Sequence, residues 1–231
     1  MSGPMGGSAS EEFLAPMPIG EDTFALAPSG KAWNVEALST PELPEIDAST
    51  TPAASKEATP DAKTIDNMIE RANADHPRTD GREWQASDIL KNVVITVKHP
   101  EDEEHDEPWR EVIVVGVPGD RTVDMKRLEA QFAPAELEEA TEEDLKQHPE
   151  LVPGYIGPMV LGPQAEAAGV KNPVRYLIDA HVVKGSAWFT GADENEVDYY
   201  NLVYGRDFKA DGVVEAVQVR HGDMSRMVPV R

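Results

Sequence analysis

Three apolar runs rich in β-branched residues constrain the fold of this chain most: VVITV at 93–97, EVIVVGV at 111–117 and VRYLIDAHVV at 174–183. Runs of this length and composition predict strands that are buried in a sheet. Residues 1–58, in contrast, are rich in Pro, Ala, Ser, Thr and Gly and contain few large apolar side chains. We therefore expect an extended segment and linker over 1–58 and one folded domain over 59–231.

Short helices are expected between these strands. Their sequences are TPDAKTIDNMIERANA, QASDILKNV, RTVDMKRLEAQF and TEEDLKQHPE. Thr59 or Asp61 is the expected N-cap of the first and Ser87 that of the second, while Thr141 and Asp144 are spaced like a capping box in the fourth. Strands and helices alternate without a strict βαβ rhythm. The order predicts an α/β (α+β) fold with a mixed, partly antiparallel sheet wrapped by short helices.

The charge balance limits the partners of the chain. It has 21 Lys and Arg residues against 43 Asp and Glu residues, a net charge of −22. Most of the surface should therefore repel a phosphate backbone, so any nucleic-acid contact must be local. No window approaches the roughly 20 apolar residues that cross a bilayer, and no signal peptide is recognisable. We expect a soluble cytoplasmic protein with no membrane partner.

Generic catalytic motifs leave the function open. The absence of cysteine excludes disulfides, thiol catalysis and cysteine-ligated zinc. The six histidines show no spacing typical of metal ligands, and no GxSxG, Walker or Rossmann glycine pattern occurs. The acidic stretch HPEDEEHDEP, at 99–108, favours a solvated hairpin loop over a metal site, because nothing fixes its two histidines in place. We predict no metal site.

Two glycine-bearing segments are the strongest candidates for a ligand site. The glycine turn, VPGYIGP at 152–158, has two prolines and two glycines in seven residues. It cannot be regular structure, and its glycines would let a ligand approach the backbone amides. The TGAD segment, at 190–193, is a second such loop at a strand end. By pattern alone, a tight loop that joins a helix to a strand is the favoured interpretation of the glycine turn, and the TGAD segment is also compatible with a simple turn.

Asp179 and Lys91 are the charged residues that stand out in apolar surroundings. Asp179 lies inside an apolar run, so its carboxylate must be paired, exposed on one face or functional. Lys91 lies where a short helix meets a strand. It is a candidate partner for Asp179, and otherwise a solvated lysine is expected.

The order of the short motifs goes further than any one of them. The motifs are TPDAKTI, DILKNVVITV, VGVPGDRTVDMKRL, ATEEDL, GYIGP, VRYLIDAHVV, WFTGAD, GRDF and VRHGD. In this order they resemble the editing insertion domain of bacterial-type prolyl-tRNA synthetases, which belongs to the YbaK/ProX-like family of aminoacyl-tRNA deacylases. The resemblance covers about residues 59–223. GPMGGSASEEFLAP and GEDTFALAPSGKAWNVEAL are similar to the part of the synthetase catalytic domain that leads into the insertion.

This resemblance implies a YbaK/ProX-like fold and hydrolysis of alanine from mischarged tRNA specific for proline. A synthetic pocket sized for proline cannot strongly exclude alanine, so a second site removes the error. The implied partners are the acceptor end of that tRNA and the rest of the parent synthetase. No cofactor is implied for editing, because ATP and Mg²⁺ serve the catalytic domain, whose binding elements we expect outside these residues. A weakened structural insertion and a tRNA 3′-end binding module are the alternatives.

The resemblance also implies site residues. Lys91 matches a lysine important for deacylation, whose cation can hold the terminal phosphate or stabilise developing negative charge. We expect its ammonium group to lie near the glycine turn and to form with it a pocket for the aminoacylated 3′ end. Asp198 stands where many relatives have a histidine in the alanine pocket. Its carboxylate could bind the ammonium group of the substrate, and the alternatives are relaxed specificity or weakened editing. Lys126 is as compatible with a solvated helix lysine as with a phosphate contact. The implied catalytic residues are Lys91, Gly154 and Asp179, and the implied substrate-binding residues are Gly157, Asp198, Gly191, Lys126, Thr59 and Glu215.

Overall fold

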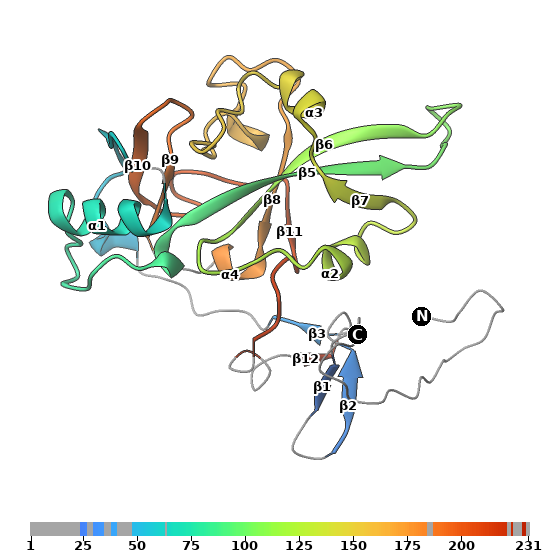
Figure 1. Ribbon diagram of the computed structural model, residues 1–231, viewed down its shortest axis with the longest axis horizontal. Coiled ribbons are helices and arrows are strands. Elements are labelled where there is room, and N and C mark those ends of the chain that lie inside the picture. Colours follow the sequence, from blue (N-terminus) through green and yellow to red (C-terminus); the bar gives the residue numbers. More distant parts are fainter. Residues whose placement is uncertain are drawn as a thin grey trace.

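A computed structural model describes residues 24–26, 30–34, 38–40, 48–62, 64–183, 187–220, 223 and 228–229 (Figure 1). The helices are α1 (Ile65–Asp75), α2 (Met125–Glu129), α3 (Glu142–Lys146) and α4 (Ala180–Val183). The strands are β1 (Phe24–Leu26), β2 (Ala32–Asn34), β3 (Leu38–Ser39), β4 (Ser55–Ala58), β5 (Leu90–His99), β6 (Trp109–Pro118), β7 (Glu136–Glu139), β8 (Arg175–Asp179), β9 (Trp188–Gly191), β10 (Val197–Leu202), β11 (Gly212–Val214) and β12 (Val228–Pro229). Within the described residues no helix is long and apolar enough to cross a bilayer.

A central five-stranded sheet has the order β11-β8-β6-β5-β7. β5 and β6 form the predicted antiparallel hairpin, which extends across the molecule in Figure 1. β8 joins β6 in parallel, β11 joins β8 in parallel, and β7 adds to β5 antiparallel. The sheet is therefore mixed, and together with the short helices it confirms the predicted α+β class.

Alternation along the strands gives this sheet two buried faces. One face packs under the segment that leads through the glycine turn, and α3 lies on this side (Figure 1). Its buried side chains include Leu90, Val114, Leu151, Leu161, Tyr176 and Ile178. The other face packs under α2 through Ile95, Ile113, Val115, Val117, Leu128 and Leu177. Strands buried on both faces explain the nearly continuous apolar runs in the sequence.

A second, three-stranded sheet has the order β4-β10-β9 and packs against α1. Trp84, Phe189 and Tyr200 form an aromatic cluster there with Ala72 of α1. A parallel bridge from Ile89 to Phe189 joins β9 to the start of the central sheet. The end of β9, which carries the TGAD segment, is thereby held next to the beginning of β5.

The predicted N-cap of the first helix is wrong. α1 begins at Ile65, and its N-cap is Thr64, whose side chain accepts a hydrogen bond from the Asn67 amide. Neither Thr59 nor Asp61 caps it. Thr59 is bonded elsewhere, and Asp61 has a φ of 64°.

The second predicted helix is also corrected. It is a single 3-10 turn over Ala86–Asp88 with Gln85 as its N-cap, in place of Ser87. The predicted strand 174–183 ends at Asp179, where α4 begins. The capping box of Thr141 and Asp144 is confirmed at α3.

Candidate functional site

The glycine turn packs directly onto the TGAD segment. A Cβ atom added at Gly191 would overlap the carbonyl group of Tyr155, and one added at Gly157 would overlap the carbonyl oxygen of Gly191. Both positions therefore require glycine because two backbones meet there. Gly154 differs, because its φ of 84° lies in the left-handed region and an added Cβ atom would meet nothing within 4 Å. The structure thus brings these three predicted glycines together.

Asp193 holds the glycine turn on the TGAD segment. Its Oδ1 atom accepts a hydrogen bond from the Gly157 amide at 2.6 Å, and its own amide donates to the Tyr155 carbonyl oxygen at 2.9 Å. Its Oδ2 atom is buried and has no hydrogen-bond partner within the described residues. Burial raises the pKa of this carboxyl group to about 6, and the Gly157 amide, the Lys56 ammonium group and the amides of Met159 and Val160 oppose the rise. Sequence reasoning missed this carboxylate.

Asn92 supports the glycine turn from β5. Its Nδ2 atom donates to the Ile156 carbonyl oxygen at 2.8 Å and lies 3.3 Å from Thr190 Oγ1. Its Oδ1 atom accepts from the Tyr176 hydroxyl group at 2.8 Å, and Thr190 donates to the Leu90 carbonyl oxygen at 2.6 Å. These bonds tie the turn to the central sheet. A single asparagine at a strand start gave no signal for this role.

Asp198 lies beside the glycines in the second sheet and binds Thr59. The register of β10 on β9 pairs Asp198 with Gly191. Asp198 Oδ2 accepts a hydrogen bond from the Thr59 hydroxyl group, whereas Oδ1 is buried without a partner among the residues that the structure describes. The residue is only 1% exposed, and burial raises the pKa of its carboxyl group to about 6. Two predicted substrate-binding residues therefore touch each other next to the glycine cluster.

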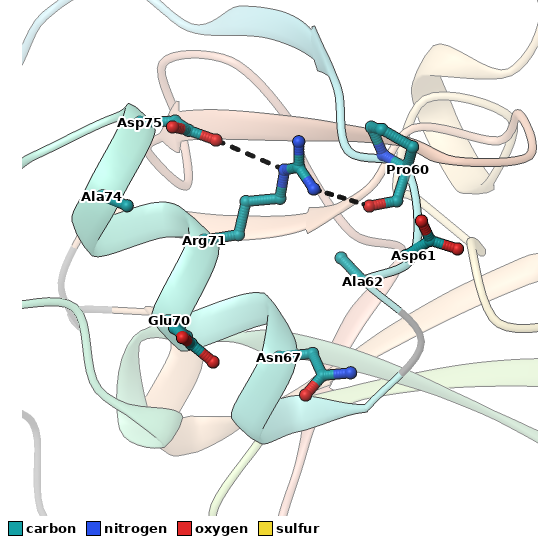
Figure 2. Close-up of a pocket in the computed structure, with 8 residues that line it drawn as sticks. All are labelled: Pro60, Asp61, Ala62, Asn67, Glu70, Arg71, Ala74 and Asp75. Atoms are coloured by element: carbon teal, nitrogen blue, oxygen red, sulfur yellow. Dashed lines mark hydrogen bonds and ion pairs between the residues drawn. The ribbon is translucent and has the colours of Figure 1, made fainter.

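A pocket of about 450 Å³ lies between α1 and residues 60–62, which follow Thr59 directly (Figure 2). Figure 2 shows Arg71 reaching across it. Arg71 Nη1 donates to the Pro60 carbonyl oxygen at 2.7 Å, and its Nε atom lies 3.3 Å from Asp75 Oδ2. Arg71 thus holds the segment after Thr59 against α1.

Lys91 lies on the other face of β5. Lys91 and Asn92 are consecutive strand residues, so their side chains point to opposite faces, and Asn92 is the one that reaches the glycine turn. Lys91 Nζ donates to the Arg121 carbonyl oxygen at 2.5 Å. The expectation that its ammonium group lies against the glycine turn is therefore wrong. Burial lowers the pKa of Lys91, and nearby Asp120 partly opposes this.

Asp179 has no free acceptor for a ligand. Its Oδ1 atom accepts from the His181 amide at 2.9 Å and lies 2.6 Å from His181 Nδ1. Its Oδ2 atom accepts from the amides of Ala216 and Val217 at 2.7 and 3.1 Å. Lys91 is not among these partners, so the suggested pairing is wrong. The carboxylate joins the end of β8 to the segment after β11.

Glu215 and Lys126 lie with α2. Glu215 Oε2 lies 2.6 Å from Arg127 Nη2, and its two oxygens accept hydrogen bonds from the amide and hydroxyl groups of Thr40 at 2.6 and 2.7 Å. Arg127 is 2% exposed and also donates to the Leu38 carbonyl oxygen at 2.9 Å. Lys126 is exposed. The structure does not bring these two predicted residues to the glycine turn.

The site therefore offers backbone polar groups and buried carboxylates. Gly154 leaves the backbone of the turn open to close approach, and Asp198 keeps one buried oxygen without a partner in the described part of the chain. Among the residues described, no group of three or more His, Asp or Glu side chains could hold a metal ion. Such a site can orient a carbonyl group and a water molecule and can receive a cation.

Comparison with known proteins supplies a family. The sequence profile described as "Aminoacyl-tRNA editing domain" matches residues 59–200. This range includes the glycine turn, the TGAD segment and the Thr59–Asp198 pair.

Among curated proteins, the chain is 99% identical over 225 residues to a proline–tRNA ligase of Bifidobacterium longum (strain NCC 2705), covering 97% of this chain and 38% of that protein. It is 79% identical over 226 residues to the proline–tRNA ligase of Bifidobacterium animalis subsp. lactis (strain AD011), with the same coverage. The identity is 50% over 223 residues with that of Kineococcus radiotolerans (strain ATCC BAA-149 / DSM 14245 / SRS30216), covering 96% and 36%. The chain thus spans well under half the length of these relatives.

Proposed function

The chain belongs to the aminoacyl-tRNA editing domain family, and from this premise we propose that it hydrolyses the ester bond between alanine and tRNA specific for proline. The observation that carries the proposal is the contact of the glycine turn with the TGAD segment beside the buried Asp198. This arrangement gives an aminoacyl ester a backbone surface and gives its amino group a carboxylate.

The chemistry needs no side-chain nucleophile. Water adds to the ester carbonyl carbon, the carbonyl oxygen becomes an oxyanion, and the bond to the ribose oxygen then breaks. The ribose oxygen takes up a proton, leaving free alanine and a tRNA with an intact 3′ end. Backbone amides at the turn are suited to stabilise the oxyanion, because fixed dipoles need little rearrangement during the reaction. The resemblance implies that the ribose hydroxyl group assists the attack of water.

Asp198 is our candidate for recognition of the amino group. Its Oδ2 atom is held by Thr59, and the unpartnered Oδ1 atom remains available. An ammonium group at Oδ1 would offset the unfavourable burial of the carboxylate charge, so binding would be favoured for a free α-amino group. The Thr59 hydroxyl group would fix the orientation of the carboxylate. Asp198 would thus help to define the alanine pocket through its negative charge, at the position where many relatives have a histidine.

Lys91 is our candidate for a phosphate contact. Its half-buried ammonium group bonds a carbonyl oxygen, and no carboxylate within the described residues forms an ion pair with it. An ammonium group without a charged partner is suited to hold a phosphate. Because it points away from the glycine turn, we assign it to binding of the tRNA end and not to the reacting ester. Gly154 is proposed to contact the ester through its backbone, and Gly157 through its Cα atom and carbonyl group, because its amide is bonded to Asp193.

We further propose that the chain works as part of a prolyl-tRNA synthetase. In support, β3 and β12 pair antiparallel, so two distant segments of the chain lie side by side, as they do where a domain is inserted into another. The net charge of −22 predicts weak tRNA affinity for this chain alone. Other domains of the synthetase would then supply the anchoring.

The test is deacylation of purified tRNA specific for proline, charged with alanine, proline or serine. We expect hydrolysis of the alanyl ester and little hydrolysis of the prolyl ester. If a normally folded chain hydrolyses none of the three esters even at high enzyme concentration, the proposal is wrong and the chain is a structural insertion. Binding of the acceptor end without turnover would replace it with a binding module.

A further inference from the structure

Hydrogen bonds position the glycine turn together with the packing of two of its side chains, since Tyr155 is buried and Ile156 packs against the core. Three residues bond its backbone from outside through their side chains. Gln164 Nε2 donates to the Pro158 carbonyl oxygen at 2.6 Å. Asn92 donates to the Ile156 carbonyl oxygen, and Asp193 bonds the backbone of both Tyr155 and Gly157. Asp193 is therefore the only carboxylate that the structure, in its described part, shows bonded to the backbone of this turn.

The contact of Asp193 with the turn is closely constrained. Gly191 lies so near Tyr155 that a Cβ atom added at Gly191 would overlap the Tyr155 backbone. The Asp193 backbone is left-handed, with a φ of 58°, a conformation that Asp and Asn adopt more readily than other residues with side chains. This conformation directs the amide and the carboxylate of one residue to Tyr155 and Gly157 together.

We infer that Asp193 is a positioning residue, which holds the glycine turn in the conformation that receives the aminoacyl ester. The inference deepens the proposed function and rests on it. Asp193 acts through the Gly157 amide and is not assigned to the reacting atoms. A misplaced turn would lower the rate of the chemical step more than the binding of tRNA, because a shift of about 1 Å at a reacting centre costs up to about 100-fold in rate.

The surroundings of Asp193 make this contact sensitive to pH. Lys56 approaches from β4 and is itself paired with Glu194, while Tyr176 faces the carboxylate from β8. Burial raises the pKa of Asp193 to about 6. The carboxylate is charged above that pH and neutral below it. The bond from the Gly157 amide is stronger to the charged form.

The experiment uses the full chain and three variants. Asp193→Gly removes the carboxylate without straining the left-handed backbone, and Asp193→Asn keeps a neutral acceptor. Glu196→Gln is the matched control, because Glu196 is exposed, lies in the same loop and also has a φ of 58°. We would measure kcat and KM for deacylation of alanyl-tRNA between pH 5 and 8, together with amide hydrogen exchange at Gly157.

We expect Asp193→Gly to lower kcat at least about tenfold with KM nearly unchanged, and to increase exchange at Gly157. Asp193→Asn should be about fivefold slower than the wild type at pH 8 and equal to it at pH 5, because the protonated carboxyl group is then also neutral. Glu196→Gln should match the wild type throughout.

Unchanged exchange at Gly157 in Asp193→Gly would overturn the inference, and so would increased exchange with an unchanged kcat. A wild-type chain that hydrolyses no aminoacyl-tRNA would instead overturn the proposed function. The Gly157 exchange would then still decide, separately, whether Asp193 holds the turn.

Discussion

Thr59 donates its hydroxyl hydrogen bond to the buried carboxylate of Asp198, which lies 139 residues further along the chain. The bond joins the segment before α1 to the strand that runs beside Gly191. It satisfies Asp198 Oδ2 and leaves Oδ1 buried without a partner in the described structure. A carboxylate held in this way carries an electrostatic cost that a cationic ligand would relieve.

Replacing Asp198 by Asn should change how stability depends on pH. In the folded protein, burial raises the pKa of the Asp198 carboxyl group to about 6 from an ordinary value of 3.8. The resulting stabilisation is present at low pH and is lost as the pH rises through 6. Between pH 5 and pH 8 the wild type should therefore lose about 1.4 kcal/mol that Asp198→Asn does not lose.

Urea unfolding of both proteins at pH 5 and pH 8 checks this prediction. The difference between the two proteins isolates residue 198 from the other titrating groups. A difference in unfolding free energy that is the same at both pH values would show that Asp198 is not a buried carboxylate with a raised pKa.

Replacing Gly154 by Ala should lower deacylation beyond its effect on folding. Gly154 and Gly205 have φ values of 84° and 83°, and an added Cβ atom would meet nothing within 4 Å at either position. Both alanine variants should therefore lose a similar amount of stability, about 1–2 kcal/mol. Only Gly154 lies in the glycine turn, so only Gly154→Ala should lower kcat, which we expect to fall at least about tenfold. Equal kcat values in the two variants would remove Gly154 from the site.

Replacing Lys91 by Ala should weaken tRNA binding. We expect KM for alanyl-tRNA to rise several-fold while kcat changes less. If Lys91 contacts one phosphate, the slope of log affinity against log salt should decrease by about 0.7. Lys146→Ala is the control, since Lys146 is exposed and paired with Glu143. A large loss of kcat with an unchanged salt slope would instead place Lys91 at the reacting ester.

Replacing Asp179 by Asn should lower stability and leave the chemistry intact. An asparagine NH₂ group would face the amide donors that now bind the carboxylate, and the loss should be roughly 2 kcal/mol. Thermal unfolding measures this loss. Deacylation well below the unfolding temperature should stay within about twofold of the wild type if the role is structural. A folded Asp179→Asn protein without activity would restore the catalytic role that the family resemblance implies.

Local signals made parts of this fold predictable. The β5–β6 hairpin follows from two β-branched runs, and the cap of α3 follows from Thr141 and Asp144, which are only three residues apart. The glycine turn stood out because few structures other than turns accept two glycines and two prolines in seven residues, and the TGAD segment stood out because its glycine lies at a strand end. β7 was missed, because its sequence ELEE has a single apolar residue and gives little strand signal.

Contacts between distant segments were not predictable from one sequence. The sequence predicted Thr59 as a helix cap, whereas its hydroxyl group donates a hydrogen bond to Asp198. The bonds of Asp193 to Gly157 and of Asn92 to Ile156 span 36 and 64 residues, and no short pattern encodes them. The orientation of Lys91 was also not predictable, because neither the resemblance nor the spacing indicates on which face of β5 its side chain lies.

Release of alanine from alanyl-tRNA specific for proline, compared with release from the same tRNA carrying N-acetylalanine, tests the central claim most directly. Acetylation removes the positive charge that Asp198 would bind and leaves the ester in place. We predict rapid release of free alanine and at least tenfold slower release of acetylalanine. Release no faster than the uncatalysed reaction from both substrates would contradict the claim that this chain hydrolyses the alanyl ester.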